Sequence, residues 1–271
     1  MSTITQTYEE ALQRICRENI APNAFAVDHE GAFPDQAIES LKTGRFLGAM
    51  SSPEVDGLGF GLPGTAMIVR RVAEECGSTA MVLCMHYCGA AVLEAHAPSD
   101  VRRAAAAGSH LSTLAFSEAG SRSHFWAPLN TATDQDGDVI LNDRKSWVTS
   151  ASHATAYVWS SRPLAAAGMS TVWLVPANAS GLTVQGPFEG LGAIFRHIGS
   201  DCTNRARPRQ FSALGALAPA GGEIGRGGRR RGNVGERGAT GSVPWGSRPG
   251  ATQPIFSVSG FGRVRLSAVI G

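Results

Sequence analysis

The first part of the chain carries apolar residues at helical spacing. Tyr8, Leu12 and Ile15 recur at i, i+4 and i+7, which is typical of one face of an amphipathic helix. Pro34 suits the first turn of a second helix, and Gly44 suits its end. The pattern predicts helices at residues 5–18, 34–44, 63–76, 78–96 and 100–107. The fourth is apolar all round near its start, so we expect it at the centre of an N-terminal helical bundle covering residues 1–111.

From residue 112 the helical period gives way to short runs rich in Val, Thr, Trp and Tyr, which favour strands. The predicted strands lie at residues 113–116, 129–133, 138–142, 146–149, 155–160, 171–175 and 182–185. The sequence Asp-Gln-Asp-Gly at residues 134–137 is typical of a hairpin turn between two of them. Short strands separated by turns predict a small antiparallel β-barrel or sandwich over residues 112–192. The expected fold class is therefore α+β, a helical bundle followed by a β domain.

The β domain contains two clusters of polar and aromatic residues. One is Ser-Glu-Ala-Gly-Ser-Arg-Ser at residues 117–123, and the other is Lys-Ser-Trp-Val-Thr at residues 145–149. Because the hairpin joins the segments that carry them, we expect the two clusters to lie close together in one sheet. Considered singly, Trp147 is typical of a core aromatic and Glu118 of a surface or turn-capping acid, while Ser117 and Thr149 are typical of ordinary strand positions.

The last part of the chain differs in composition. Residues 193–271 hold 16 of the 33 glycines, and 12 Arg against 3 acidic residues give this segment a net charge of +9. The remainder carries 12 basic and 19 acidic residues, a net charge of −7. No sustained helical or strand period follows Gly192, which predicts an irregular Gly/Arg-rich tail. Such a tail is either disordered or the product of a reading frame that shifts near Gly192, a hypothesis that resequencing the gene would test.

Cysteine positions and uncharged runs bear on the location of the chain. Five cysteines, an odd number in mostly apolar helical context, predict buried free thiols in a reducing compartment. Cys84 and Cys88 share a face of the fourth predicted helix while His86 points away, so we expect no metal site. The N-terminus has acids and no apolar run, and the uncharged runs at 76–93 and 163–188 are broken by polar residues or Pro. We therefore expect a soluble, cytoplasmic protein with no membrane span.

Taken together, the two clusters resemble the flavin-binding signature of the acyl-CoA dehydrogenase family. The family has T-E-P-G-A-G-S-D followed by N-G-x-K-x-W-I-T. This chain has Ser117-Glu118-x-Gly120-x-x-Ser123 followed by Asn142-x-x-Lys145-x-Trp147-Val148-Thr149. Residues 52–60 resemble the family's P-E-E-Y-G-G-L-G loop, and residues 172–182 resemble its strand ending in Val-Pro. Two linked motifs in the expected order are far more specific than either alone. The resemblance covers residues 8–192, so the family's helical C-terminal domain is missing.

The resemblance implies an FAD enzyme that oxidises the CH–CH bond of an acyl-CoA by proton abstraction and hydride transfer to flavin. It implies that Leu114, Phe116 and Ser117 line the isoalloxazine ring, that Trp147 flanks it, and that Thr149 hydrogen-bonds near the hydride-accepting nitrogen. Ser123 is the implied substrate-binding residue, near the thioester arm of the acyl-CoA. The full set of implied cofactor-binding residues is Leu114, Phe116, Ser117, Gly120, Ser123, Trp147, Val148 and Thr149.

The chain departs from the family pattern at several positions. Ala119, Arg122, His124 and Asp143 replace the usual Pro, Gly, Asp and Gly. Arg122 puts a cation where small residues normally approach the substrate, which fits either stronger binding of the CoA arm or an altered choice of substrate. The family's catalytic carboxylate usually lies in the C-terminal domain. We therefore assign no catalytic base, and neither Glu189 nor Glu223 takes that role.

By the same resemblance, the partners would be an acyl-CoA substrate and an electron-transfer flavoprotein or similar acceptor, with a homo-oligomer if the chain is complete. Three alternatives stay open. One is a flavin-dependent monooxygenase of the same fold, and another is a non-functional fragment. The third is a nucleic-acid binder acting through the Gly/Arg tail. Aromatic residues are sparse in the tail, which argues against nucleic-acid binding.

Overall fold

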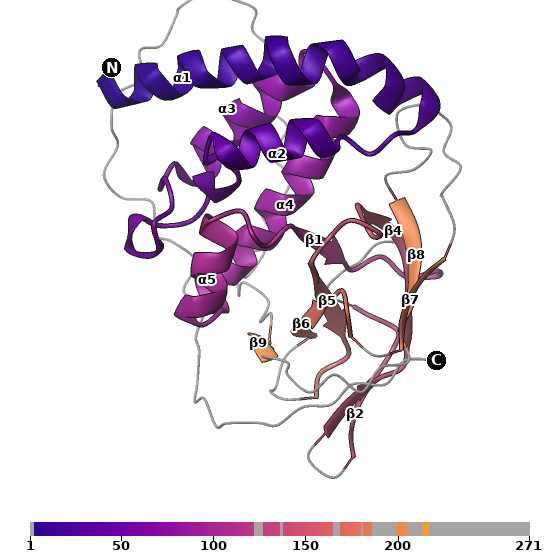
Figure 1. Ribbon diagram of the computed structural model, residues 1–271. Coiled ribbons are helices and arrows are strands. Elements are labelled where there is room, and N and C mark those ends of the chain that lie inside the picture. The colour runs from indigo at the N-terminus through magenta and orange to yellow at the C-terminus, as the bar shows by residue number, and fades with distance from the viewer. Residues whose placement is uncertain are drawn as a thin grey trace, which may run out of the picture.

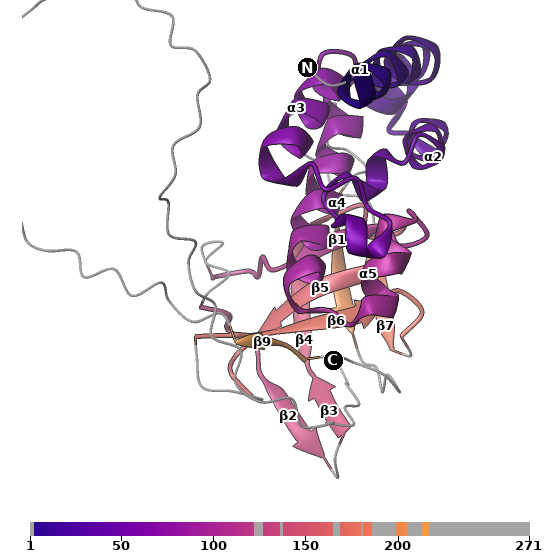
Figure 2. The same cartoon turned by 90° about the vertical axis from the view of Figure 1, so that its left-hand side faces the viewer.

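The computed structural model describes residues 3–121, 127–135, 138–164, 169–179, 181–185, 199–204 and 213–216. These residues form a helical layer stacked on a β layer (Figure 1). The turned view separates the two layers. In it the hairpin of β2 (Ala132–Gln135) and β3 (Asp138–Leu141) extends away from the helices (Figure 2).

Within the described residues, the helical layer contains the five predicted helices, with ends shifted by a few residues. They are α1 (Thr3–Ile15), α2 (Asp35–Thr43), α3 (Gly61–Ala73), α4 (Gly77–His96) and α5 (Ser99–Ala106). After α1 the chain continues through short π- and 3₁₀-helical turns, and two more such turns precede α3. These are η1 (Cys16–Ile20), η2 (Ala21–Asn23), η3 (Ala26–Glu30), η4 (Phe46–Ala49) and η5 (Pro53–Val55).

Helix α4 is the central element of the helical layer, as its apolar sequence predicted. It packs against α3, α5 and strand β1 (Ser112–Ala115). Its N-cap is Cys76, whose Sγ accepts a hydrogen bond from the Thr79 N–H at 3.5 Å. By length and composition α4 is apolar enough to cross a membrane, and 56% of its most apolar stretch is already buried inside the fold.

Two buried rings on α4 join this helix to its neighbours. His86 Nε2 lies 2.9 Å from the Leu47 carbonyl oxygen, and Nδ1 accepts a hydrogen bond from the Ser112 N–H at 3.2 Å. Because Nδ1 accepts, the ring proton sits on Nε2 and is donated to Leu47. Tyr87 Oη donates to the Phe46 carbonyl oxygen at 2.7 Å. Complete burial lowers the pKa of His86 to about 4, so the ring is neutral at pH 7 and fixes the start of β1.

In the part of the chain that the structure describes, the β layer consists of three hydrogen-bonded groups of strands. The first has the order β1-β5-β6-β9, with β5 (Ala156–Ser161), β6 (Thr171–Pro176) and β9 (Ala213–Ala216). The second is the predicted β2–β3 hairpin, in which Gln135 pairs with Asp138. The third has the order β4-β8-β7, with β4 (Asp143–Thr149), β7 (Leu182–Gln185) and β8 (Gly199–Asn204).

The predicted order, helices first and strands after them, is confirmed. Two details of the β prediction are corrected. Strand β1 runs parallel to β5, so the sheet is mixed rather than antiparallel. The chain between β1 and β5 is long and contains β2, β3 and β4, which gives it room to return to the same end of the sheet. In addition, the described strands form open sheets and do not close into a barrel.

Strands β8 and β9 come from the segment after Gly192, where the sequence predicted no regular element. Strand β8 lies between β4 and β7, and β9 lies at the edge beside β6. Most of residues 193–271 lie outside the described residues, so the expectation of a disordered or frame-shifted tail stays a prediction, as do the domain boundaries at 111 and 192.

The sheet containing β5 is buried on both faces. Val158 packs towards α4 and α5, in a cluster with Leu93 and Ala105. On the opposite face Trp159 packs with Trp173 and the β2–β3 residues Val139 and Leu141. All six residues of β5 are therefore buried, including the polar Ser160 and Ser161, which explains why its burial does not alternate along the strand.

Candidate functional site

The two sequence clusters meet at the end of β1. The Ser146 N–H donates to the Ser117 carbonyl oxygen at 2.8 Å, and Thr113 Oγ1 donates to the Thr149 carbonyl oxygen at 2.7 Å. The prediction that the clusters lie close together is thus confirmed. The prediction that they share a sheet is wrong, because β1 and β4 belong to different sheets and are joined edge to edge by these bonds.

Trp147 is held out of the core by an irregular backbone. The pairing of β4 with β8 shifts between Lys145 and Val148, which is the signature of a β-bulge. Trp147 has a φ of 62°, a left-handed conformation that bulky residues rarely adopt, and its residue surface is 60% exposed. The general expectation of a core aromatic is wrong here. Residues with a strained backbone conformation cluster at functional sites.

Five other implied flavin residues differ in how far they are buried. Leu114 and Phe116 are half-buried against the cluster between α4 and the sheet, and Ser117 and Thr149 are also half-buried. Gly120 is exposed in a turn with a φ of 90°, which suits glycine.

Two of the implied residues stand apart from the others. The side chain of Val148 is fully buried in the β core, so at this position only the backbone can face a cofactor. Ser123 lies outside the described residues, as do the departures Arg122 and His124.

A buried cluster of charged residues lies beneath the junction, and sequence reasoning missed it. The Lys145 ammonium donates to Glu118 Oε1 and lies 2.7 Å from Asp143 Oδ2. All three side chains are at most 1% exposed. Glu118 Oε2 also accepts from the Leu129 N–H at 2.6 Å. The expectation that Glu118 is a surface acid is therefore wrong, although its place in both the cluster and the family motif was a signal for a role.

Asp143 makes further bonds inside this cluster. Its Oδ2 accepts from Trp159 Nε1 at 2.9 Å, and its Oδ1 accepts from Asn130 Nδ2. Burial raises the pKa of Asp143 above the usual range for aspartate, and the adjacent Lys145 ammonium opposes the rise. Because Glu118 and Asp143 are both committed to these internal bonds, neither is assigned as a catalytic base.

The residues at the junction match what a flavin requires. A flavin needs hydrogen-bonding groups at its ring edge, a flat apolar cover and exclusion of water. The exposed Trp147 indole offers the flat cover, and the half-buried Leu114 and Phe116 offer apolar surface. Ser117 and Thr149 offer hydroxyl groups beside them. The donor set therefore fits the cofactor that the sequence implied.

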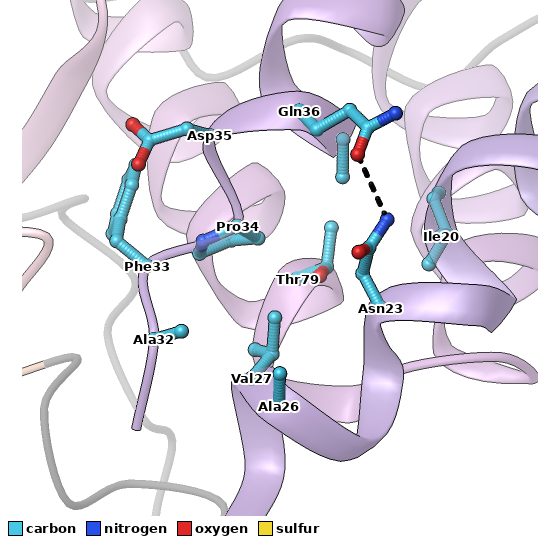
Figure 3. Close-up of a pocket in the computed structure, with 11 residues that line it drawn as sticks. Ile20, Asn23, Ala26, Val27, Ala32, Phe33, Pro34, Asp35, Gln36 and Thr79 are labelled. Carbon is cyan, nitrogen blue, oxygen red and sulfur yellow. Dashed lines mark hydrogen bonds between the residues drawn. The ribbon is translucent and has the colours of Figure 1, made fainter. Parts of the chain in front are cut away.

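Two hollows in the helical layer do not involve these residues. One, of about 240 Å³, lies between the η1–η3 turns and α2, where Asn23 Nδ2 donates to Gln36 Oε1 at 3.1 Å across one side (Figure 3). The other, of about 420 Å³, lies between α1 and α3 and is lined by Tyr8, Phe60 and Met67 among others. Neither is lined by a residue of the two motifs.

Comparisons with known proteins identify the domains to which the chain is similar. Residues 4–106 match the N-terminal domain of acyl-CoA dehydrogenase, and residues 113–200 match its middle domain. The chain is 24% identical over 195 residues to the probable acyl-CoA dehydrogenase YngJ of Bacillus subtilis, covering 69% of this chain and 51% of that protein. It thus spans about half the length of the curated relatives that it matches.

Solved structures show the same fold. The butyryl-CoA dehydrogenase of Megasphaera elsdenii superposes with a TM-score of 0.66 at 17% identity, covering 74% of this chain and 55% of that one. PigA, solved with FAD and proline, superposes with a TM-score of 0.62 at 19% identity, over 74% of this chain and 55% of that one. Because the two domain matches together cover well over half of the sequence, the chain belongs to the acyl-CoA dehydrogenase family.

Proposed function

We propose that the chain binds FAD at the junction of β1 and β4 and serves as the flavin-holding part of an enzyme that oxidises the CH–CH bond of an acyl-CoA. The observation that carries the proposal is the bulge at Trp147. A tryptophan at a φ of 62° costs about 1–3 kcal/mol of backbone strain, and this residue is also 60% exposed. Stacking against a flavin would cover the exposed ring and offset the strain, and family membership supports this ligand.

Each residue of the chain has a defined part in this proposal. Trp147 covers one side of the ring, and the hydroxyls of Ser117 and Thr149 hydrogen-bond its edge. Leu114 and Phe116 line the site with apolar surface that keeps water out. When bound, FAD supplies the acceptor for the hydride that leaves the acyl chain. We assign no base for the accompanying proton, and Glu189 and Glu223 lie outside the described residues.

The first experiment is a titration of the purified chain with FAD, followed by visible absorbance and flavin fluorescence. We expect a bound-flavin spectrum and a clear loss of affinity in Trp147→Ala. Phe25→Ala is the matched control, because Phe25 is a similarly exposed aromatic (66%) on the helical layer and lies on no motif. A folded chain that takes up no FAD would contradict the proposal.

A second experiment separates the dehydrogenase from a monooxygenase of the same fold. Adding acyl-CoA to the FAD-loaded chain without oxygen should bleach the flavin absorbance if the chain is a competent dehydrogenase. Turnover that requires both reduced flavin and oxygen would instead favour the monooxygenase. A flavin that binds but is never reduced by acyl-CoA would limit this chain to the cofactor-binding part.

The partners follow from the same proposal. The substrate is an acyl-CoA, the electron acceptor is an electron-transfer flavoprotein or a similar protein, and the location is the cytoplasm. The proposal includes a homo-oligomer if the chain is complete. The reducing location is consistent with the free thiols of Cys16, Cys76, Cys84 and Cys88.

A further inference from the structure

Lys145 stands directly before the bulge that turns Trp147 outward. Asp143 and Lys145 are both buried, as expected for alternate residues on one face of β4. Continued alternation would bury Trp147 as well. The shift in pairing between Lys145 and Val148 instead buries Val148 and exposes Trp147. The shift in pairing therefore begins directly after the buried Lys145, and its position decides that Trp147 faces the junction.

Lys145 also connects the two motifs. Its ammonium reaches from the second motif to Glu118, which directly follows Ser117 in the first motif. The backbone bond from Ser146 to Ser117 lies next to this ion pair in both segments. A charged link and a backbone hydrogen bond thus act at consecutive positions, and together they fix the strand carrying Trp147 relative to the end of β1.

Asp143 adds a second support that the family pattern does not contain. Its carboxylate holds Lys145 from the other side and is itself held by Trp159 Nε1 and Asn130 Nδ2. The usual glycine at this position would have no side chain to make these three bonds. The ammonium therefore sits between two buried carboxylates, and its side chain is locked in one orientation.

We propose that Lys145 is a positioning residue that, through Glu118 and Asp143, sets the bulge presenting Trp147 to the flavin beside Ser117. The inference rests on the proposed function, because it names how this chain orders the site that function requires. Lys145 itself is fully buried and does not contact the cofactor; it acts through the backbone of residues 146–148.

The test compares flavin affinity with stability in two variants. Lys145→Met keeps the length of the side chain and removes the ammonium, leaving two buried carboxylates without their shared partner. We expect the dissociation constant for FAD to rise on the order of tenfold or more, and the bound flavin to regain fluorescence that a stacked indole quenches. Lys145→Met with Glu118→Gln also removes the charge that Lys145→Met leaves unpaired on Glu118, so the free energy of unfolding should partly recover, while Asp143 keeps its bonds from Trp159 and Asn130.

The dissociation constant for FAD and the free energy of unfolding together test whether Lys145 positions the bulge. If Lys145 positions the bulge, the double variant regains part of the lost stability but keeps the raised dissociation constant for FAD, because the link between the motifs is still absent. If affinity returns together with stability, the inference is overturned. Arg102→Met is the control: it breaks a partly buried pair with Glu94 in the helical layer and should lower stability without changing FAD affinity.

Hydrogen exchange keeps the two proposals distinguishable. If the wild-type chain binds no FAD, the proposed function fails, and amide exchange in residues 144–149 decides the role of Lys145. Faster exchange there in Lys145→Met than in Arg102→Met supports the positioning role. Equal exchange in the two variants overturns it.

Discussion

The helical layer and the β layer bury polar groups in opposite ways. In the helical layer His86 is enclosed as a neutral ring, and each of its nitrogens has a backbone partner. In the β layer Glu118, Lys145 and Asp143 are enclosed as a cluster of charges with formal groups of both signs. The stability that the neutral His86 ring contributes depends on pH. The stability that the charged cluster contributes depends on every member being present. The comparison indicates which perturbation each layer tolerates least.

The largest effect should come from breaking the charged cluster. Lys145→Met leaves Glu118 and Asp143 buried and facing each other, so we expect a loss of about 3–5 kcal/mol in the free energy of unfolding. Urea denaturation of the variant against the wild-type chain measures it. A loss below about 1 kcal/mol would show that the cluster takes up water or a proton at little cost.

The next largest effect should come from lowering the pH, which acts on the buried His86 ring. The pKa of His86 is about 4 in the folded chain and about 6.5 when unfolded, so the ring is neutral in both states above pH 6.5. Between pH 6.5 and 4 the unfolded chain takes up a proton that the folded chain refuses. Stability therefore falls as the pH is lowered through this window, by about 3 kcal/mol in total.

Urea denaturation at pH 7 and pH 4.5 checks this prediction, with His86→Gln as the comparison. The variant should lose most of the pH-dependent part of the wild-type curve while starting from a lower stability at pH 7. Burial also lowers the pKa of the neighbouring His110, which adds a smaller loss of the same sign in both proteins. If the free energy of unfolding fell by the same amount between pH 7 and pH 4.5 in both proteins, the role given to His86 would be contradicted.

A milder test of the charged cluster is the loss of one neutral donor. Trp159→Phe preserves most of the buried ring but removes the indole N–H that Asp143 accepts at 2.9 Å. We expect a destabilisation of about 1–3 kcal/mol, because a buried carboxylate oxygen loses a partner. Thermal unfolding measures the change. Trp173→Phe is a matched control at the paired position on β6, where the indole donates to the Ser161 hydroxyl instead of a carboxylate.

The smallest effect on stability should come from the exposed member of the site. Trp147→Gly places the residue that favours a φ of 62° at the bulge, so we expect stability to change by less than about 1 kcal/mol in either direction. FAD binding should fall sharply in the same protein. A large destabilisation would mean that Trp147 serves the fold rather than the ligand.

Sequence reasoning located the elements that depend on neighbouring residues. The spacing of Tyr8, Leu12 and Ile15 predicted α1, and the Asp-Gly turn predicted the β2–β3 hairpin. These signals are local, because a helix face and a tight turn are both specified within a few residues. The candidate site residues were likewise found from motifs, and the structure brings Ser117, Trp147 and Thr149 to one junction.

The features that sequence reasoning missed depend on pairing between distant segments. The outward turn of Trp147 requires β8 as the partner of β4, and β8 lies in a segment with no strand period. The burial of Glu118 depends on Lys145, which is 27 residues away in the chain. The parallel pairing of β1 with β5 likewise has no local signature, since either direction fits the same apolar residues.

That parallel pairing has a consequence for how the chain folds. Ser112 must find Ala156 across a loop that contains three other strands, so closing this contact has a high entropic cost. Early formation of the β2–β3 hairpin shortens the effective loop. The helical layer, built mainly from local contacts, should therefore assemble quickly, and the central sheet should form in a later, slower phase.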